Sequence, residues 1–260
     1  MKRSRQRPRK VRPNIPLWKI GSHRKPRVRR FRWIRIIPFK IILVLLGLYV
    51  LFEILTFPFL SIARLPTENP TETALMRQRI EEAHDQGTTL NIDYRWTSLA
   101  NVPRHVRMAI LVSEDASFYS HDGVNWHEVL ESIETNLEKG RIVRGGSTIT
   151  QQLSKNLYLS TSRDPIRKVK ELILTWILET TLSKKRILEL YLNIIEWGHG
   201  VFGIEAAAQR YFHKPASQLT MEEGARLAAV IPSPLRHQPT ETTSYVEKKK
   251  DLILRRMSTR

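Results

Sequence analysis

Beyond about residue 100, apolar residues recur every three or four positions, which is the spacing of an amphipathic helix. Many of these stretches begin with Ser, Thr, Asp, Asn or Pro, the residue types that favour a helix start. One earlier stretch, Thr88–Trp96, alternates instead like a short strand. The pattern predicts a mainly α-helical domain, with helices over residues 71–83, 103–113, 125–139, 148–157, 164–177, 183–195, 204–212 and 220–231.

Three of these helices carry a stripe of large apolar residues that we expect to face the core. Their helical spacing is explained by packing alone, without a bound ligand. The residues are Trp126, Val129, Leu130, Ile133 and Leu137; Ile166, Val169, Ile173, Trp176 and Ile177; and Ile187, Leu188, Tyr191, Leu192 and Ile195.

Residues 41–60 form an apolar run with a single charged residue, Glu53. Twenty residues of helix match the hydrocarbon thickness of a bilayer, so the run predicts one transmembrane helix. Basic residues gather on its N-terminal side, which by the positive-inside rule stays in the cytoplasm. A cleaved signal peptide is the alternative, because Ser61-Ile62-Ala63 resembles a cleavage site, but the leader and the apolar core are both long for one. An acid within a span is a functional candidate, although near its outer end Glu53 can reach the interface.

The net charge of +18 is concentrated ahead of this run. Residues 1–40 hold 16 of the 43 Lys and Arg and no Asp or Glu, which leaves 27 basic against 25 acidic residues in the rest of the chain. The tail has too little apolar content to build a core and is predicted to be disordered. Because it is rich in arginine and proline and lies beside an expected span, we favour binding to anionic lipid headgroups over binding to nucleic acid.

Several kinds of site are excluded or not indicated. The chain has no cysteine, so it has no disulfide framework, thiolate metal site or thiol nucleophile. His199 and His213 have no metal-ligand spacing to each other or to an acid cluster, and no metal site is predicted from them. An S-x-x-K spacing occurs at Ser22 to Lys25, but a disordered tail cannot build an active site around it.

The first stretch with candidate chemistry is S-E-D-A-S-F-Y-S-H-D-G, residues 113–123. An apolar run ends there at two adjacent carboxylates, Glu114 and Asp115. Burial at the edge of an apolar segment raises the pKa of a carboxyl group, which suits a general acid or base near neutral pH. A helix end with solvated acids explains this stretch alone equally well.

The second stretch is R-I-V-R-G-G-S-T-I-T-Q-Q-L-S-K-N-L, residues 141–157. Its two glycines allow a close backbone approach, and Ser147 or Thr148 can cap the following helix. The helix then carries several donors on a shared face, which is typical of a phosphate- or sugar-facing surface: Gln151, Gln152, Lys155 and Asn156.

A third group lies on the helix that starts at Asp164. Arg167 and Glu171 are four residues apart with Lys168 beside them, so a guanidinium, an ammonium and a carboxylate share a face. On an open surface such a pair contributes only a few tenths of a kcal/mol. In a cleft, the same residues could hold a diphosphate.

Four motifs in this order resemble family 51 glycosyltransferases, the peptidoglycan polymerases that join lipid II units. They are E-D-A-S-F-Y-S-H-D-G, G-G-S-T-I-T-Q-Q-L-S-K-N-L, R-K-V-K-E and K-K-R-I-L-E-L-Y-L-N, within about Asp93 to Pro239. An anchor followed directly by this domain resembles the monofunctional form. Only about 20 residues follow Pro239, which leaves no room for a transpeptidase domain.

The resemblance implies a lysozyme-like helical glycosyltransferase domain behind a single N-terminal transmembrane helix. It implies that Glu114 is the general base on the 4-hydroxyl of the acceptor lipid II, and that Glu171 supports the reaction. The attack inverts the anomeric centre, gives a β-1,4 bond and releases a polyprenyl diphosphate. The implied substrate-binding residues are Asp115, Phe118, His121, Thr148, Gln151, Gln152, Lys155, Asn156, Arg167 and Lys168.

The expected organisation and partners follow from the resemblance and the anchor. The expected partners are lipid II, the growing lipid-linked glycan, membrane lipids and other cell-wall synthesis or division proteins, and no nucleic acid. Family members are commonly assayed with a divalent cation, Mg or Mn, although no ligand set is readable. The domain is expected outside the inner membrane with the N-terminus in the cytoplasm. The expected segments are a tail 1–40, an anchor 41–60, a membrane-proximal linker 61–92, a catalytic domain 93–240 and a C-terminal helix 241–260.

Two other functions fit part of the pattern. A lytic hydrolase could use Glu114 as general acid on a similar fold. The cationic residues after Glu114 argue against it, because an uncharged leaving group does not need them. An inert anchored scaffold is the other alternative, and it predicts that Glu114→Gln changes nothing.

Overall fold

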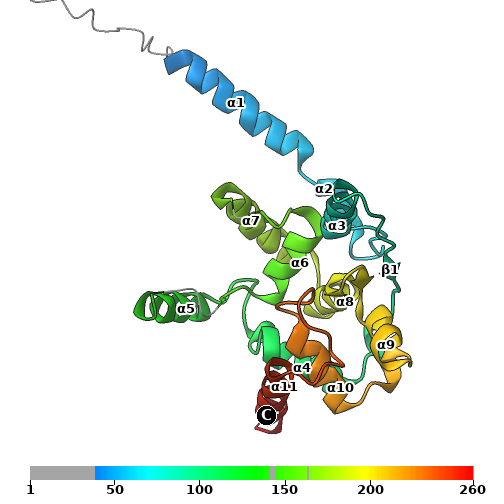
Figure 1. The fold of residues 1–260 in the computed structure, drawn as a ribbon. Coiled ribbons are helices and arrows are strands. Elements are labelled where there is room, and N and C mark those ends of the chain that lie inside the picture. Colours follow the sequence, from blue (N-terminus) through cyan, green and yellow to red (C-terminus); the bar gives the residue numbers. More distant parts are fainter. Residues whose placement is uncertain (1–38, 141–144, 163, 260) are drawn as a thin grey trace, which may run out of the picture. The chain divides into compact units, whose positions relative to one another are not determined.

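A computed structural model describes residues 39–140, 145–162 and 164–259 (Figure 1). The predicted basic tail lies almost wholly outside the described residues, as do the first four residues of the second motif. The chain divides into two compact units, with the boundary between Phe57 and Pro58.

The first unit contains one described helix, α1 (Phe39–Thr56). The prediction of a single helix over 41–60 is wrong at its C-terminal end, because α1 ends at Thr56 and a separate helix, α2 (Phe59–Arg64), begins after Pro58. Proline has no N–H to donate and its ring obstructs the preceding turn, so a helix breaks there. Among the residues that the structure describes, none of the helices combines the length and apolarity of a membrane span.

The second unit is mainly helical, as predicted (Figure 1). After α2, its helices are α3 (Ala74–Asp85), α4 (Arg104–Glu114), α5 (Trp126–Glu138), α6 (Ile149–Tyr158), α7 (Pro165–Thr181), α8 (Lys184–Ile194), α9 (Ile204–Phe212), α10 (Met221–Val230) and α11 (Ser244–Ser258). Short 3-10 turns are η2 (Leu99–Asn101), η3 (Phe118–Ser120) and η4 (Ala216–Gln218).

Most of the predicted helix starts are confirmed by side chains that accept from the first-turn N–H groups. Asn125, Asp164, Ser183 and Thr220 are the N-caps of α5, α7, α8 and α10. The start of α3 was predicted two residues early, because Thr73 and not Thr71 is its N-cap. These starts are set by local hydrogen bonds, which is why residue type and spacing predict them.

A small three-stranded sheet was only partly predicted. Its strands are β1 (Asp93–Tyr94), β2 (Glu196–Gly198) and β3 (Val201–Phe202), in the order β1-β3-β2. β1 is parallel to β3, and β2 is antiparallel to it. The expected strand over 88–96 is thus shortened to two residues, and β2 and β3 form a hairpin that was not predicted. The pairing joins segments far apart in sequence, which local patterns do not reveal.

The helices that carry the candidate site residues pack in two groups. α6 packs against α7 and α8, while α4 packs against α10 and α11. The predicted stripe of α8 is confirmed, since Ile187, Leu188, Tyr191 and Leu192 are fully buried.

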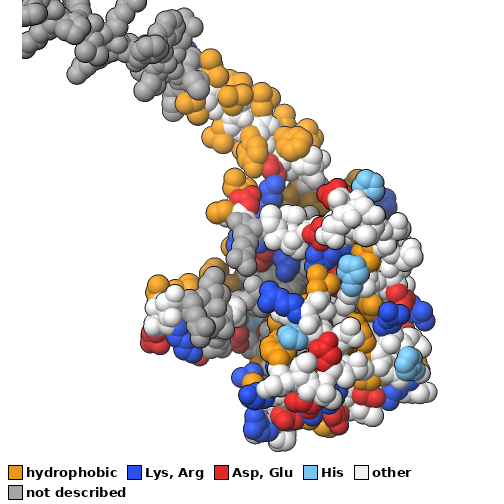
Figure 2. Space-filling view, in the orientation of Figure 1, with side chains coloured by type: hydrophobic (Ala, Val, Ile, Leu, Met, Phe, Trp, Pro, Cys, Tyr) orange, Lys and Arg blue, Asp and Glu red, His pale blue; other side chains and the backbone are white. Residues whose placement is uncertain are grey.

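The core-facing stripes predicted for α5 and α7 are wrong. On α5, Trp126 is 65% and Leu137 77% exposed; on α7, Trp176 is 65% exposed. Leu130, Ile133, Ile166, Val169 and Ile173 are exposed as well, and only Val129 and Ile177 are partly buried. α5 stands apart from the other helices in Figure 1, with hydrophobic side chains along it in Figure 2. α7 buries a different face, formed by Glu171, Leu174, Thr175 and Leu178.

Candidate active site

Glu114 is the last residue of α4, and Asp115 is the cap that follows it. The Asp115 carboxylate is buried, and its two oxygens lie 3.0 and 3.1 Å from Nε2 of His121. Because Nδ1 of His121 accepts from the backbone N–H of Gly123, Nε2 carries the proton that Asp115 accepts. Asp115 also accepts from the N–H of Ile149 in the first turn of α6. Its hydrogen bonds therefore fasten the end of α4 to the start of α6.

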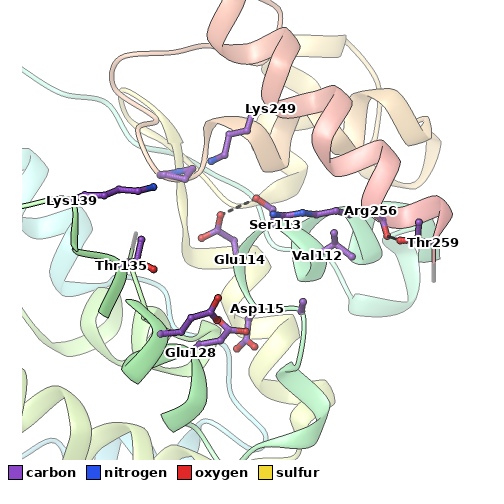
Figure 3. A pocket seen from close by; sticks show the side chains of 14 residues that line it. Val112, Ser113, Glu114, Asp115, Glu128, Thr135, Lys139, Lys249, Arg256 and Thr259 are labelled. Carbon is purple, nitrogen blue, oxygen red and sulfur yellow. Dashed lines mark hydrogen bonds between the residues drawn. The ribbon is translucent and has the colours of Figure 1, made fainter. Parts of the chain in front are cut away.

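The Glu114 carboxylate has two hydrogen-bond donors from different elements. Gln152 Nε2 donates to Oε2 at 3.0 Å, and Ser113 Oγ donates to Oε1 at 3.2 Å. The carboxylate faces a cavity of about 980 Å³, and Figure 3 shows Lys249 of α11 reaching toward it. The cavity is lined by Val112, Ser113, Glu114, Asp115, Ala116, Glu128, Glu131, Thr135, Lys139, Gly145, Pro232, Lys249, Arg256 and Thr259.

Burial raises the pKa of Glu114 above the usual range of a carboxyl group. The hydrogen bond from Gln152 and the charge of Lys249 act in the opposite direction, and Asp115 adds a smaller rise. The pKa of Lys249 is itself lowered by burial, although the charge of Glu114 partly restores it. A carboxylate with a raised pKa is a stronger base than a solvated one, provided that it is ionised at the working pH.

Thr148 and Gln151 stabilise the first turn of α6. They form a capping box, in which the Thr148 side chain accepts from the N–H of Gln151 and the Gln151 side chain accepts from the N–H of Thr148. The Thr148 hydroxyl donates to the carbonyl of Gly123 at 2.5 Å. Gly123 has φ 87°, and a Cβ there would lie 2.8 Å from side-chain carbons of Thr175 and Glu179. Both predicted substrate residues are buried, as is Phe118.

α6 contributes residues both to the surroundings of Glu114 and to a second group of side chains, which is cationic. Gln152, which touches Glu114, and Lys155 are three residues apart and share a face, with a rise of about 4.5 Å between them. Burial lowers the pKa of Lys155, and Glu171 raises it while Arg167 and Lys168 lower it. Asn156 is buried next to Lys155 in the sequence and lies on a different face of the helix.

The cationic group is organised by Glu171. Its carboxylate is 3% exposed and accepts from Arg167 Nη1 at 2.8 Å and from the Lys168 ammonium. The predicted i,i+4 pair is confirmed, and it lies at a partly buried site rather than on an open surface. Arg167 and Lys168 are thus held by one carboxylate, and Lys155 lies near enough to interact electrostatically with all three. This leaves an excess of positive charge, which suits an anionic group such as a diphosphate.

A sequence profile of the transglycosylase family matches residues 83–258, which is more than half of the chain. The chain belongs to this family. The transglycosylase domain so defined includes α4, α6, α7 and α11, which carry the residues described above.

Relatives named biosynthetic peptidoglycan transglycosylase match most of the chain. The one from Herminiimonas arsenicoxydans is 41% identical over 225 residues, which cover 86% of this chain and 94% of the relative. The one from Ralstonia nicotianae is 50% identical over 177 residues, covering 68% and 76%. The one from Bordetella pertussis is 39% identical over 237 residues, covering 90% and 97%.

Four residues that matter to the site were not predicted as site residues: Ser113, Tyr191 and Lys249 of the transglycosylase domain, and Arg79, which precedes it. Tyr191 contacts Gln152, and Arg79 contributes to the electrostatics of Lys155. Tyr191 and Lys249 follow their partners by many residues, so only the fold brings them together. Ser113 adjoins Glu114, and its polar side chain at the end of an apolar run was a usable signal.

The transglycosylase domain does not offer a metal site within its described residues. No three His, Asp or Glu side chains there gather closely enough to hold an ion. Both oxygens of Glu171 accept from cationic side chains, so this carboxylate is already neutralised without a metal.

Proposed function

We propose that the protein is a peptidoglycan glycosyltransferase that polymerises lipid II into linear β-1,4 glycan strands. The arrangement along α6 is the observation that carries this proposal. At one position Gln152 contacts the carboxylate of Glu114, and one turn later Lys155 joins the cationic group around Glu171. A base for a hydroxyl and a binding site for a diphosphate thus both lie along α6, and the relatives named biosynthetic peptidoglycan transglycosylase support the same function.

In the proposed reaction, Glu114 accepts the proton of the acceptor 4-hydroxyl. The oxygen attacks the anomeric carbon of the growing chain from the side opposite the diphosphate, which inverts that centre. A new carbon–oxygen bond forms, and the bond to the diphosphate breaks with its electron pair going to the leaving group. Lys155, Arg167 and Lys168 stabilise the negative charge that develops on the diphosphate. The proton remains on Glu114 until solvent removes it.

Glu171 acts through the basic side chains in this proposal. By accepting from Arg167 and Lys168, it fixes two flexible cations before the substrate arrives. Charged groups that are already oriented lose less entropy when the leaving group forms. Asp115 has a comparable supporting role, because it holds α4 and α6 together beside Glu114.

The membrane attachment of the protein is part of the proposal. The apolar side chains along α1, the basic residues that precede it and the exposed apolar faces of α5 and α7 support contact with a lipid surface (Figure 2). We place the N-terminus in the cytoplasm and the catalytic unit outside the inner membrane. Protease added to spheroplasts should then digest the unit after Pro58 and leave the tail intact, and digestion of the tail alone would refute this orientation.

The decisive test of the reaction compares Glu114→Gln with the wild type on purified lipid II. We expect the variant to lose glycan polymerisation almost completely while its far-UV circular dichroism is unchanged, because an amide cannot accept the proton. Glu128→Gln is the matched control, since this acid lines the same cavity without contacting Gln152, and it should retain most of the activity.

The same assay, together with polymerisation measured in the cell, separates the alternatives. A hydrolase would shorten preformed glycan and produce no polymer from lipid II. A scaffold would leave polymerisation in the cell unaffected by Glu114→Gln. Either outcome would overturn the proposed function.

A further inference from the structure

Three side chains from three helices form a hydrogen-bonded chain that ends at Glu114. Tyr191 of α8 donates its Oη–H to Oε1 of Gln152 at 3.0 Å. Gln152 of α6 donates Nε2–H to Oε2 of Glu114, at the end of α4, also at 3.0 Å. Tyr191 is fully buried, so it lies behind the amide rather than in the cavity.

The polarity of this chain is fixed at Tyr191. A glutamine amide presents an acceptor at one end and donors at the other, and a rotation of 180° about its last bond exchanges them. A tyrosine hydroxyl can also accept, but the proton of this buried hydroxyl donates to Gln152 Oε1, and no other acceptor for it is found among the described residues. Rotation of the amide would leave that proton unpaired in the core, which is costly. Burial raises the pKa of Tyr191 well above its ordinary value, so it stays protonated over the range in which Glu114 titrates. The NH2 end of Gln152 therefore points to Glu114.

We propose that Tyr191 is a positioning residue for the base: through Gln152 it presents an N–H donor, and never a carbonyl oxygen, to the carboxylate of Glu114. The inference rests on the proposed role of Glu114 as base. A donor at this place favours the ionised carboxylate, which is the form that accepts a proton. A carbonyl oxygen in the same place would repel the carboxylate and favour its protonated, inactive form.

Two groups that face Glu114 can reverse the sign that they present to it. The Gln152 amide does so by rotation about its last bond, and the Ser113 hydroxyl does so by donating to the carbonyl of Ala228 instead of to Glu114. Among the described residues, the titratable or charged groups that interact with Glu114 or line its cavity are Asp115, Glu128, Glu131, Lys139, Tyr191, Tyr245, Lys249 and Arg256. Tyr191 acts on the amide, because its hydroxyl is hydrogen-bonded to Gln152.

The test is the pH dependence of kcat/KM for lipid II polymerisation by the full-length protein. In Tyr191→Phe we expect the acidic limb to move to higher pH, so that the rate on that limb falls about three- to tenfold while the plateau changes little. Tyr211→Phe is the matched control, because this half-buried hydroxyl also donates a hydrogen bond, to the carbonyl of Trp197. An acidic limb that moves equally in both variants, or in neither, would overturn the proposal.

A double-mutant cycle shows whether Tyr191 acts through Gln152. Gln152→Leu removes the donor to Glu114 and should move the acidic limb at least as far as Tyr191→Phe does. Adding Tyr191→Phe to that background should then produce no further movement, and an additive movement would refute the indirect role. If Tyr191→Phe does not fold, a wild-type acidic limb in Gln152→Leu alone is sufficient to reject the proposal. Activity retained by Glu114→Gln would instead reject the proposed function, so the two failures are distinguishable.

Discussion

At the scale of single residues, the burial of Glu114 makes its ionised form unfavourable in the folded protein. Burial raises its pKa in the folded protein above that of the unfolded chain. The folded state therefore holds more protons between these two pKa values, and stability falls as the pH rises through that window. At neutral pH the ionised carboxylate is thus less favourable in the fold than a neutral group of the same shape.

It follows that Glu114→Gln, which we expect to be inactive, should be more stable than the wild type at neutral pH. We expect its Tm to be higher, and each kcal/mol of added stability corresponds to about 2–4 °C for a domain of this size. Differential scanning calorimetry at several pH values checks this. The difference should vanish at acid pH, where Glu114 is protonated, and a variant less stable at all pH values would contradict the argument.

Lys249 gives a second prediction at this scale. Its positive charge lowers the pKa of Glu114, so Lys249→Met should raise that pKa and move the acidic limb of the pH–rate profile upward. We expect about three- to tenfold less activity on that limb and a smaller change on the plateau. Lys248→Met is the control, because this neighbouring lysine is exposed and does not line the cavity. Equal effects of the two substitutions would contradict a specific role for Lys249.

Site residues could be predicted where the signal was local. Glu114 was indicated by an apolar run that ends at a carboxylate, and the Arg167–Glu171 pair by its spacing of four. The sequence predicts Thr148 as a possible helix cap, and the resemblance implies that Thr148 and Gln151 bind substrate. T-x-x-Q is also the spacing of a capping box, and the structure contains one. No local pattern predicts Lys249 as a site residue, because a lysine on a helix surface is usually solvated.

At the scale of elements, α6 connects Glu114, the proposed base, to the cationic group. The capping box in the first turn of α6 fixes the direction of the helix. Thr148→Ala removes both the N-cap and the hydrogen bond to the carbonyl of Gly123. We expect a loss of about 1 kcal/mol or somewhat more in the free energy of unfolding. We also expect lower polymerisation activity, because Gln152 and Lys155 are placed by this helix.

Thr220→Ala provides the matched control for that prediction. Thr220 caps α10 with the same type of capping box, formed with Glu223. Chemical denaturation should show a similar loss of stability, about 1 kcal/mol, in both variants. Only Thr148→Ala should lose activity when the two are assayed well below their unfolding transitions. Comparable losses of activity in both would mean that stability alone explains the effect.

Helix existence could be predicted from the sequence, but the packing of two helices could not. A 3.6-residue period identifies an apolar face, and it does not say what covers that face. α8 buries its stripe, whereas α5 and α7 expose theirs. On α7 the buried face includes Glu171 and Thr175, which a hydrophobic pattern cannot select. The small sheet was missed because β1 pairs with a strand that follows it by about a hundred residues.

At the scale of the whole molecule, the exposed apolar faces distinguish α5 and α7 from the rest of the unit after Pro58. A protein surface seldom exposes several large apolar residues on one helix face unless that face binds something. The proposed substrate carries a polyprenyl chain, and Arg167 and Lys168 of the cationic group lie on α7 together with Ile166, Val169, Ile173 and Trp176. The apolar chain of a lipid-linked sugar, or the bilayer that holds it, is therefore the expected contact of this face.

Replacing Ile173 and Trp176 of α7 by serine tests this expectation. Both side chains are exposed, so the free energy of unfolding should change by less than about 0.5 kcal/mol. Binding of the unit after Pro58 to vesicles with anionic lipids should weaken about tenfold or more, because about 1.5 kcal/mol or more is lost per large apolar side chain removed from lipid. Met221→Ser, a similarly exposed apolar position at the start of α10, should leave vesicle binding unchanged. Vesicle binding that does not change with the α7 substitutions would show that this face does not contact lipid. The proposed role of Glu114 would not be affected, because the polymerisation assay tests it separately.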